Sequence, residues 1–154
     1  MDQLKIRIAT MNDLPLLLEF EQGLISAERP FDPTLKKGPT SYYDIEEMIR
    51  AENIHLIVAE INEKLVGTGY ARIETSKIYL QHKYHGYLGF MYVVPEHRRK
   101  GVNNKILENL TQWCKSKNIH ELRLDVYNEN TDAWHAYEKA GFTKHLIEMR
   151  MEIK

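Results

Sequence analysis

The chain has 154 residues, of which 43% are hydrophobic and 28% are charged; this is typical of one globular domain with a single core and excludes a disordered chain. Its formal net charge of -1 argues against a dedicated nucleic-acid binder, because such proteins normally carry a large positive excess. No apolar stretch approaches the roughly 20 residues that span a bilayer, and the first ten residues lack the apolar region of a signal peptide, so we expect a cytoplasmic protein that does not bind membranes.

The first half of the chain predicts a strand, a helix, a long loop, a second helix and a hairpin. The loop contains three prolines and a glycine, and loops of this length often form part of a substrate site. Two alternating apolar runs around Asn62, Glu63 and Lys64 are a hairpin signal. In chain order we expect a strand over Leu4–Ala9, a helix capped by Thr10 or Asn12, a loop over 27–42, a short acidic helix over 44–50, and strands over 54–61 and 65–73.

The middle of the chain predicts a buried strand followed by an amphipathic helix. An apolar run ends at Pro95, and apolar residues then recur at helical spacing, so we expect a helix that begins near Lys100 or Gly101. The buried stripe of that helix comprises Val102, Ile106, Leu107, Leu110, Trp113 and Cys114. Cys114 is the single cysteine, which excludes an internal disulfide and a cysteine-cluster metal site, and its place on this stripe favours a core thiol over a nucleophile.

A basic turn precedes this helix. Arg98, Arg99 and Lys100 lie where the helix dipole already concentrates positive potential, so each cation is unfavourable there by roughly 0.3–1 kcal/mol. A polyanion would relieve this repulsion, and the free N–H groups of the first turn, together with close approach at Gly101, would form a phosphate cradle. The alternative interpretation is a solvated basic turn.

The last third predicts a strand, a helix and a final strand. Leu122 to Tyr127 alternates, and Asn128 or Asn130 is suited to cap a helix over Thr131–Lys139. Gly141 is expected in the C-cap position of that helix. From Phe142 onward, FTKHLIEMRMEIK alternates well enough for a final strand.

Two motifs resemble those of a known family. RRKGVNNK, Arg98 to Lys105, resembles the acyl-CoA pyrophosphate loop of the GNAT superfamily of N-acetyltransferases, with Asn103 replacing the second small residue of the pattern. Asn130, Ala133, Tyr137, Lys139, Gly141 and Phe142 have the spacing of the GNAT signature in which the Asn and the nearby helix contact CoA and the Tyr lies near the sulfur. Because both motifs occur in the expected order, about thirty residues apart, the resemblance covers nearly the whole chain.

The resemblance implies a GNAT-like α/β (α+β) fold, with a mixed, mostly antiparallel central sheet flanked by helices in a single domain over 1–154. It implies an acetyl-CoA-dependent N-acetyltransferase that acts directly on a primary amine of a small molecule or peptide, with no metal and ordinarily as a homodimer. Tyr137 would protonate the CoA thiolate as the catalytic acid. The cofactor-binding residues that the resemblance implies are Met91, Tyr92 and Val93 through their backbone, Arg98, Arg99, Lys100, Gly101, Val102, Asn103, Asn104 and Lys105 around the pyrophosphate, and Asn130, Ala133 and Tyr137.

The general base is not evident from the sequence. Many relatives carry an acidic residue on the central strand, where this chain has Gly89 and Phe90. Glu74, His82 or His85 would serve through a water molecule, as would a chain of waters alone, although each histidine is more often a surface residue. The missing acid supports an alternative function, a catalytically impaired CoA-binding protein with a regulatory or interaction role.

The acceptor is also open. Polyamines, amino acids, aminoglycoside-like amines and protein amino termini all remain candidates. Five acidic residues lie in the segments that flank the acceptor side in this family, where they would attract a cationic amine or simply form a solvated face: Glu21, Glu28, Asp44, Glu46 and Glu47.

Overall fold

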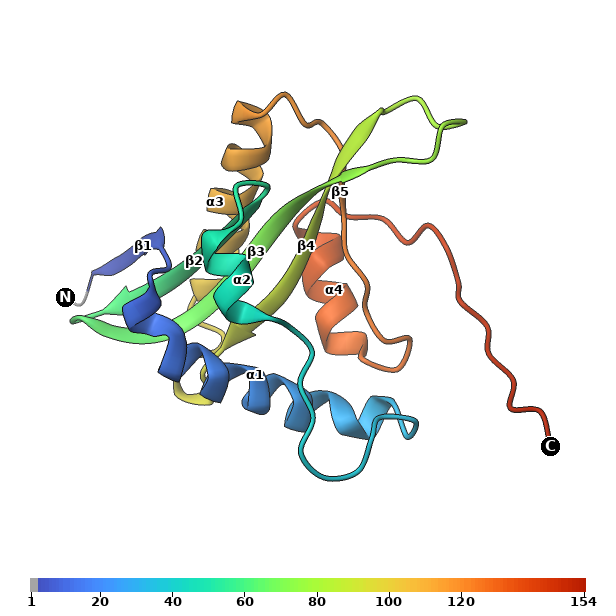
Figure 1. Cartoon of the computed structure of the whole chain (residues 1–154), viewed down its shortest axis with the longest axis horizontal. Coiled ribbons are helices and arrows are strands. Elements are labelled where there is room, and N and C mark those ends of the chain that lie inside the picture. The colour runs from blue at the N-terminus through green and yellow to red at the C-terminus, as the bar shows by residue number, and fades with distance from the viewer. Residues whose placement is uncertain (1–2) are drawn as a thin grey trace.

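A computed structural model describes residues 3–154 and contains a five-stranded sheet with the strand order β1-β2-β3-β4-β5 (Figure 1). The first four strands pair antiparallel, and β5 pairs parallel with β4, which confirms the mixed, mostly antiparallel sheet. The strands are β1 (Leu4–Ile8), β2 (Ile54–Ile61), β3 (Lys64–Thr75), β4 (Tyr84–Val93) and β5 (Leu122–Arg123).

Helices cover both faces of the sheet, with α3 on one face and α1 and α2 on the other, while α4 lies near β4 (Figure 1). The helices are α1 (Leu14–Glu28), α2 (Ile45–Arg50), α3 (Val102–Ser116) and α4 (Thr131–Lys139), with short 3-10 turns at Met11–Asp13, Arg29–Phe31 and Pro95–His97. The helices predicted from the sequence are therefore confirmed, although α3 begins one or two residues later than expected.

The alternation of β2 explains why the sheet has two apolar cores. Successive strand side chains point to opposite faces. Ile57 and Ala59 accordingly pack with the buried stripe of α3, whereas Leu56 and Val58 pack with α1 and α2. Each face therefore buries its own helix layer, and the sheet is held rigidly between them.

Local hydrogen bonds fix the ends of several elements. Asp13 accepts from the Thr10 backbone N–H at 2.8 Å and from both terminal nitrogens of Arg7 at 2.8 and 2.9 Å, which ties β1 to the start of α1. The β2–β3 connection is a two-residue turn, because Asn62 and Glu63 both have positive φ, 52° and 64°, as a type I′ hairpin turn requires. Lys64 already belongs to β3.

The strand predicted over Leu122–Tyr127 is wrong beyond Arg123. After Arg123 the backbone no longer pairs with β4, although the Asp125 side chain still accepts a hydrogen bond from the hydroxyl of Tyr87 on β4 at 2.8 Å, and Tyr127 is drawn to the end of α1. There the Tyr127 hydroxyl bonds Asp32 at 3.2 Å, and its ring stacks on Phe31 with centroids 6.2 Å apart.

The final strand predicted from Phe142 onward does not form: among the described residues, the segment has no strand partner. Sequence alternation shows that a segment suits a strand, but a strand also needs an edge with which to pair. The C-cap of α4 is Ala140 rather than Gly141, which follows it with a φ of 111°.

Candidate active site

A bulge opens the middle of β4. Tyr70 pairs with Gly89 and Thr68 with Tyr92, so that Phe90 and Met91 lie opposite the single residue Gly69. Phe90 has a positive φ of 52°, and such a bulge bends the strand and increases its twist. β5 pairs with β4 only at Gly86 and Tyr87. From residue 88 to 93, the edge of β4 that faces away from β3 is therefore bent and pairs with no strand of the described chain.

The basic turn lies at the end of this open edge and leads into an uncapped helix. Gly101, the N-cap of α3, has a φ of 84° and offers no side-chain cap to the first N–H groups of the helix. Arg99 also has a positive φ, 63°, and a Cβ atom at Gly101 would meet nothing within 4 Å. The turn thus presents free N–H groups and open space, which are the two features that a phosphate cradle needs.

The cations of the turn differ in orientation. Arg98 donates from Nε to the Val93 carbonyl at 2.8 Å, and its guanidinium lies 5.5 Å from the centre of the Tyr92 ring, so it braces the strand end. Arg99 and Lys100 are exposed. Lys105 is also exposed and lies 3.5 Å from Glu108. The Val93 carbonyl, which the sequence suggested for a ligand, is thus already engaged by Arg98.

Tyr137 and Asn103 come together at this end of α3. Tyr137, on α4, is half-buried, and burial raises the pKa of its hydroxyl to about 12. The side chain of Asn103 lies close to this hydroxyl and acts in the opposite direction, while the charge of Glu28 raises the pKa further. The hydroxyl therefore stays protonated at neutral pH, as a proton donor must. The two sequence motifs, which are far apart along the chain, meet here.

Asn130 holds the start of α4. Its side-chain oxygen accepts from the Ala133 N–H at 3.3 Å, which confirms it as the cap of this helix. Ala133 is half-buried on the first turn, and next to it the Trp134 indole donates to the Asn128 carbonyl at 3.2 Å. These bonds fix the orientation of the helix that carries Tyr137.

The structure explains why β4 has no acidic residue at Gly89. A Cβ atom at Gly89 would lie under 3.0 Å from the hydroxyl and ring of Tyr70, which is itself buried. The Tyr70 ring thus fills the space that a side chain on this strand position would need.

The base candidates from the sequence lie elsewhere. His85 is near the start of β4, five residues and roughly 17 Å before Phe90 at 3.3–3.4 Å per residue. It is buried, with Nδ1 2.7 Å from the Ser76 hydroxyl and Nε2 3.4 Å from Glu74. Glu74 also pairs with Arg72, and His82 is exposed on the connection between β3 and β4. These three residues therefore do not reach the bulge.

A carboxyl group that the sequence did not single out as a base lies near Tyr42 and Tyr137. Glu28, the last residue of α1, is half-buried, and burial raises the pKa of its carboxyl, which the nearby Tyr42 hydroxyl lowers by a smaller amount. The Glu28 charge also contributes to raising the pKa of Tyr137 and, after burial as the larger cause, that of Tyr42. The Tyr42 hydroxyl is buried and lies near the Glu28 carboxylate, but it makes no hydrogen bond of normal geometry to that group or to any other among residues 3–154.

The aromatic residues of the loop after α1 connect Glu28 with the bulge. Tyr43 packs on Phe90 with centroids 5.0 Å apart, and neighbouring Tyr42 lies edge-on to Tyr43 at 5.7 Å. Glu21 fixes both tyrosines, since its carboxylate accepts from their backbone N–H groups at 2.9 and 2.8 Å. The partial burial of Glu28 and the unpartnered hydroxyl of Tyr42 identify this site, and neither property is visible in the sequence.

The remaining acidic residues have structural or solvent roles. Glu21 is only 1% exposed, so the expectation that it faces solvent or a cleft is wrong. Asp44 caps α2 through the Glu47 N–H at 3.1 Å, and Glu46 pairs with Arg50 on the exposed face of that helix. Of the five acids considered for an amine, Glu28 alone combines partial burial with proximity to Tyr137.

Cys114 has a structural role, and the potential metal ligands of the described chain are dispersed. Cys114 is 1% exposed, and burial raises the pKa of its thiol to about 11, which confirms a core thiol. Among residues 3–154, no three His, Cys, Asp or Glu side chains gather as they would to bind a metal ion.

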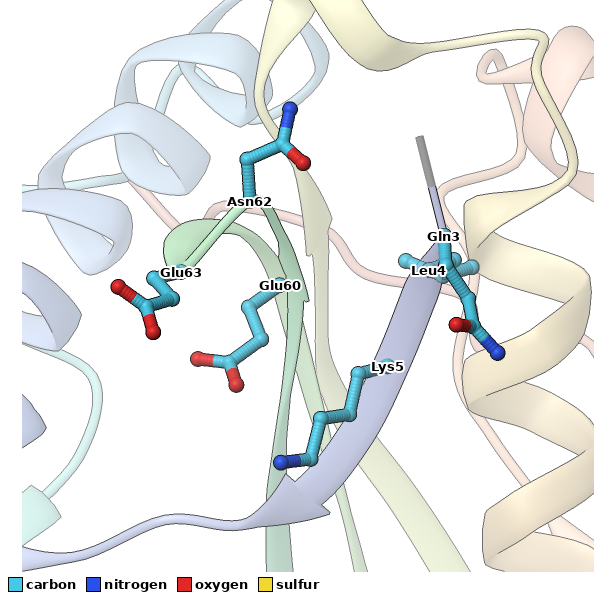
Figure 2. Close-up of a pocket in the computed structure, with 6 residues that line it drawn as sticks. All are labelled: Gln3, Leu4, Lys5, Glu60, Asn62 and Glu63. Atoms are coloured by element: carbon cyan, nitrogen blue, oxygen red, sulfur yellow. The ribbon is translucent and has the colours of Figure 1, made fainter. Parts of the chain in front are cut away.

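A hollow on the opposite edge of the sheet lies apart from these groups. Figure 2 shows its lining, which comes from β1 and the β2–β3 turn: Gln3, Leu4, Lys5, Glu60, Asn62 and Glu63. Lys5 and Glu60 are register partners across β1 and β2 and project to the same side. Because this hollow lies at the β1 edge, it shares no residue with the β4 bulge or with α4.

Comparison with known proteins identifies the protein family. Residues 22–142 match the family model described as the acetyltransferase (GNAT) family. The match covers most of the chain and includes the β4 bulge, the basic turn and Tyr137. The chain belongs to the acetyltransferase (GNAT) family.

A curated relative matches over a short stretch only. A Bacillus subtilis (strain 168) protein described as an uncharacterized N-acetyltransferase, YobR, is 36% identical over 59 residues, which are 38% of this chain and 24% of that protein. The matched stretch thus spans about a quarter of the relative's length.

Solved structures share the fold over nearly the full chain. A mutant protein from Bacillus halodurans has a TM-score of 0.85 at 16% identity, covering 97% of this chain and 99% of the other. A predicted acetyltransferase with acetyl-CoA from Clostridium acetobutylicum has a TM-score of 0.72 at 21% identity, covering 97% and 96%. An aminoglycoside 6′-N-acetyltransferase from Acinetobacter haemolyticus has a TM-score of 0.73 at 18% identity, covering 97% and 99%. At these identities the likeness establishes the GNAT fold.

Within residues 3–154, no helix combines the length and the apolar character that a membrane-crossing helix requires.

Proposed function

We propose that the protein transfers the acetyl group of acetyl-CoA directly to a primary amine. The observation that carries this proposal is the convergence of Tyr137 and Asn103 at the uncapped start of α3, beside the open edge of β4. Arg99, Lys100 and the N–H groups after Gly101 would hold the pyrophosphate. Backbone groups of β4 at and beside the bulge, from Met91 and Tyr92, would align the acetyl arm and stabilise the oxyanion.

The proposed proton route uses two side chains. In the overall reaction a carbon–nitrogen bond forms and the carbon–sulfur bond of the thioester breaks. The bound ammonium loses two protons, one before it attacks and one as the amide forms, while the departing sulfur gains one, so one proton is released to solvent. Glu28 accepts the proton that leaves before the attack, directly or through water, because its raised pKa makes it a better base than an ordinary carboxylate. Tyr137 donates a proton to the sulfur, because its pKa, raised to about 12, keeps its hydroxyl protonated.

The proposed acceptor is a cationic amine that enters between the loop after α1 and α4. A protonated amine would donate to the Glu28 carboxylate and to the Tyr42 hydroxyl, which otherwise lacks a partner in the described chain. The aromatic rings of Tyr42 and Tyr43 would pack on its carbon skeleton. Polyamines and amino sugars fit this chemistry, and the aminoglycoside acetyltransferase among the structural neighbours is a reason to include amino sugars in a screen.

The experiment that tests this function measures CoA thiol release from acetyl-CoA with a panel of polyamines, amino acids, aminoglycosides and short peptides, with CoA affinity measured on the same sample. Turnover with one class of amine establishes the enzyme and its acceptor. CoA binding without turnover for any amine favours the alternative of a CoA-binding regulator, which the absence of an acid at Gly89 supports. A failure to bind CoA contradicts the proposed pyrophosphate site.

The role of Glu28 is tested with Glu28→Gln. If Glu28 takes the amine proton, kcat/KM of the native enzyme rises with pH as this carboxyl ionises, above the range of an ordinary carboxyl because its pKa is raised. The Gln variant should lose that rise and about tenfold in kcat/KM, with CoA affinity unchanged. The matched control is Glu46→Gln on the exposed face of α2, which should leave the profile unchanged.

A further inference from the structure

An aromatic row, which consists of Tyr43, Tyr70 and Tyr87, crosses the face of the sheet that carries α1 and α2. Tyr43 lies edge-on to Tyr70 with ring centres 5.9 Å apart. The guanidinium of Arg72 then bridges the next two rings, since it lies 5.6 Å from the ring centre of Tyr70 and 5.3 Å from that of Tyr87. The row begins near Glu28, whose charge contributes to raising the pKa of Tyr43 after burial as the larger cause.

The strand register places the far end of the aromatic row relative to the bulge. Tyr70 is the register partner of Gly89, and Arg72 is the register partner of Tyr87. Tyr87 and Gly89 are two residues apart on β4, so they share one face and lie about 7 Å apart along the strand. The Tyr87 ring therefore lies on the side of the bulge that is away from the basic turn.

Asp125 lies at this far end of the row. Its carboxylate accepts a hydrogen bond from the Tyr87 hydroxyl at 2.8 Å, and its side chain is exposed. Burial and this hydrogen bond raise the pKa of Tyr87, so the hydroxyl stays protonated and holds the carboxylate at neutral pH. An ionised carboxylate offers about four acceptor sites, so it keeps free capacity for a ligand that donates hydrogen bonds.

The two arginines at this end of the row already have carboxylate partners. Arg72 donates from Nε to Glu74 at 2.7 Å, and Arg123 donates from Nε to Glu121 at 2.7 Å. Asp125, in contrast, forms no ion pair with any cation of residues 3–154. The far end of the row thus carries an uncompensated negative charge, which a cationic ligand would neutralise.

We propose that Asp125 binds a second ammonium group of the acceptor, so that the preferred substrate is a linear diamine or polyamine. The reacting amine lies at Glu28, and the carbon chain of the acceptor lies along the aromatic row. Aromatic faces attract ammonium groups, and the carboxylate then accepts a charge-assisted hydrogen bond from the second one. This inference rests on the proposed acetyl transfer and narrows its acceptor, because an amine with a single positive charge lacks the second contact.

The first test compares kcat/KM for α,ω-diaminoalkanes of increasing length with kcat/KM for the alkylamine of the same length. The native enzyme should prefer the diamine by about tenfold at one chain length, because the second ammonium gains a hydrogen bond between charged groups. Asp125→Asn should abolish this preference by raising KM for the diamine, with a much smaller loss for the alkylamine. Asp125 is exposed, so the variant should fold, and circular dichroism checks this.

The matched control for this test is Glu121→Gln. Glu121 belongs to the same segment as Asp125, but its carboxylate is held by Arg123. The control should therefore keep the preference for the diamine. A control that loses as much of the preference as Asp125→Asn would overturn the specific role of Asp125 and indicate a general effect of negative charge.

The second test measures diamine binding without turnover. Calorimetry is carried out with the diamines of the series in the presence of CoA, which has no acetyl group to transfer. The Kd should rise about tenfold in Asp125→Asn, and Asp125→Glu, which retains a carboxylate, should recover part of the affinity. Added salt should weaken binding to the native enzyme more than to the Asn variant, because it screens the lost interaction.

The two tests distinguish a failure of this inference from a failure of the proposed function. Turnover without a preference for diamines, or an equal loss for diamine and alkylamine in Asp125→Asn, overturns the role of Asp125 and leaves the acetyl transfer intact. If no amine supports turnover, the proposed function fails, and the calorimetry then decides the binding site alone. In that case a Kd that rises in Asp125→Asn supports the site, whereas an unchanged Kd or an absence of diamine binding overturns it.

Discussion

The helices α3 and α4 both flank the open edge of β4, yet they contribute to the site in opposite ways. α3 has five buried residues and an uncapped N-terminus, whereas α4 has no buried residue and is capped by Asn130. The first helix is therefore part of the core and offers its backbone end to a ligand, and the second is peripheral and offers one side chain, Tyr137. Stability and the proposed binding of CoA are therefore concentrated in α3, and the proposed proton transfer in α4.

The largest effect is expected from the core of α3. Leu110→Ala removes a side chain that is 0% exposed, and leaves a cavity between the helix and the sheet. The free energy of unfolding should fall by about 3 kcal/mol in urea denaturation. Gln112→Ala, on the exposed face of the same helix, should change it by less than about 0.5 kcal/mol. Similar losses in the two variants would mean that α3 is not the core helix.

Tyr137→Phe tests α4. Turnover should fall roughly 100-fold because the thiolate loses its proton donor, while the Kd for CoA changes little. The pKa is raised to about 12, so the hydroxyl is protonated below that pH, and no falling limb of kcat from Tyr137 should occur in neutral or mildly alkaline solution. Tyr127→Phe is the control, since that hydroxyl bonds Asp32. Equal losses of turnover and CoA affinity would indicate a structural role for the Tyr137 hydroxyl.

Gly101→Asp would give the N-terminus of α3 a side-chain cap, which α4 already has in Asn130. The new carboxylate would accept from the free N–H groups of α3 and repel a pyrophosphate, so CoA affinity should weaken about tenfold in calorimetry. Gly101→Ala carries the backbone strain of the positive φ without the charge, and should cost about 1 kcal/mol of stability with a smaller loss of affinity. If Ala weakened binding as much as Asp, strain rather than anion competition would be responsible.

Asn130→Ala should have the smallest effect of the set. Loss of the bond to the Ala133 N–H should lower the free energy of unfolding by about 1 kcal/mol, as measured in urea denaturation. Asn130→Asp keeps an acceptor at this position and should retain most of that stability. A loss of CoA affinity in the Asp variant would show that the amide also contacts the cofactor, as the family resemblance implies.

Sequence periodicity predicted most of the fold because each element buries one face. The alternation of β2 and the stripe of α3 specify their neighbours, since the side chains in question are fully buried. β5 and the C-terminal segment were predicted less well for a different reason. Their alternation is genuine, but strand formation there depends on whether an edge is available, and beyond Arg123 the Tyr127 side chain packs at the end of α1 while the backbone no longer pairs with β4.

The candidate site was predicted only in part. The spacing of Arg98 to Lys105 and of Asn130 to Tyr137 identified two motifs, and their meeting at Asn103 agrees with that reading. Glu28 could not be distinguished from other acids, because its significance depends on burial and on Tyr42 and Tyr137, which are distant along the chain. His85 was considered a base on residue type alone, and its bonds to Ser76 and Glu74 show why type is insufficient.

The packing of Tyr70 against Gly89 also constrains the evolution of this enzyme. An acidic side chain at position 89 would need the space that the Tyr70 ring occupies, since any Cβ there meets the ring. Shrinking Tyr70 first would open a void in the core beside Tyr43 and Phe90. Either change alone is costly, so we expect substitutions at these two positions to occur together.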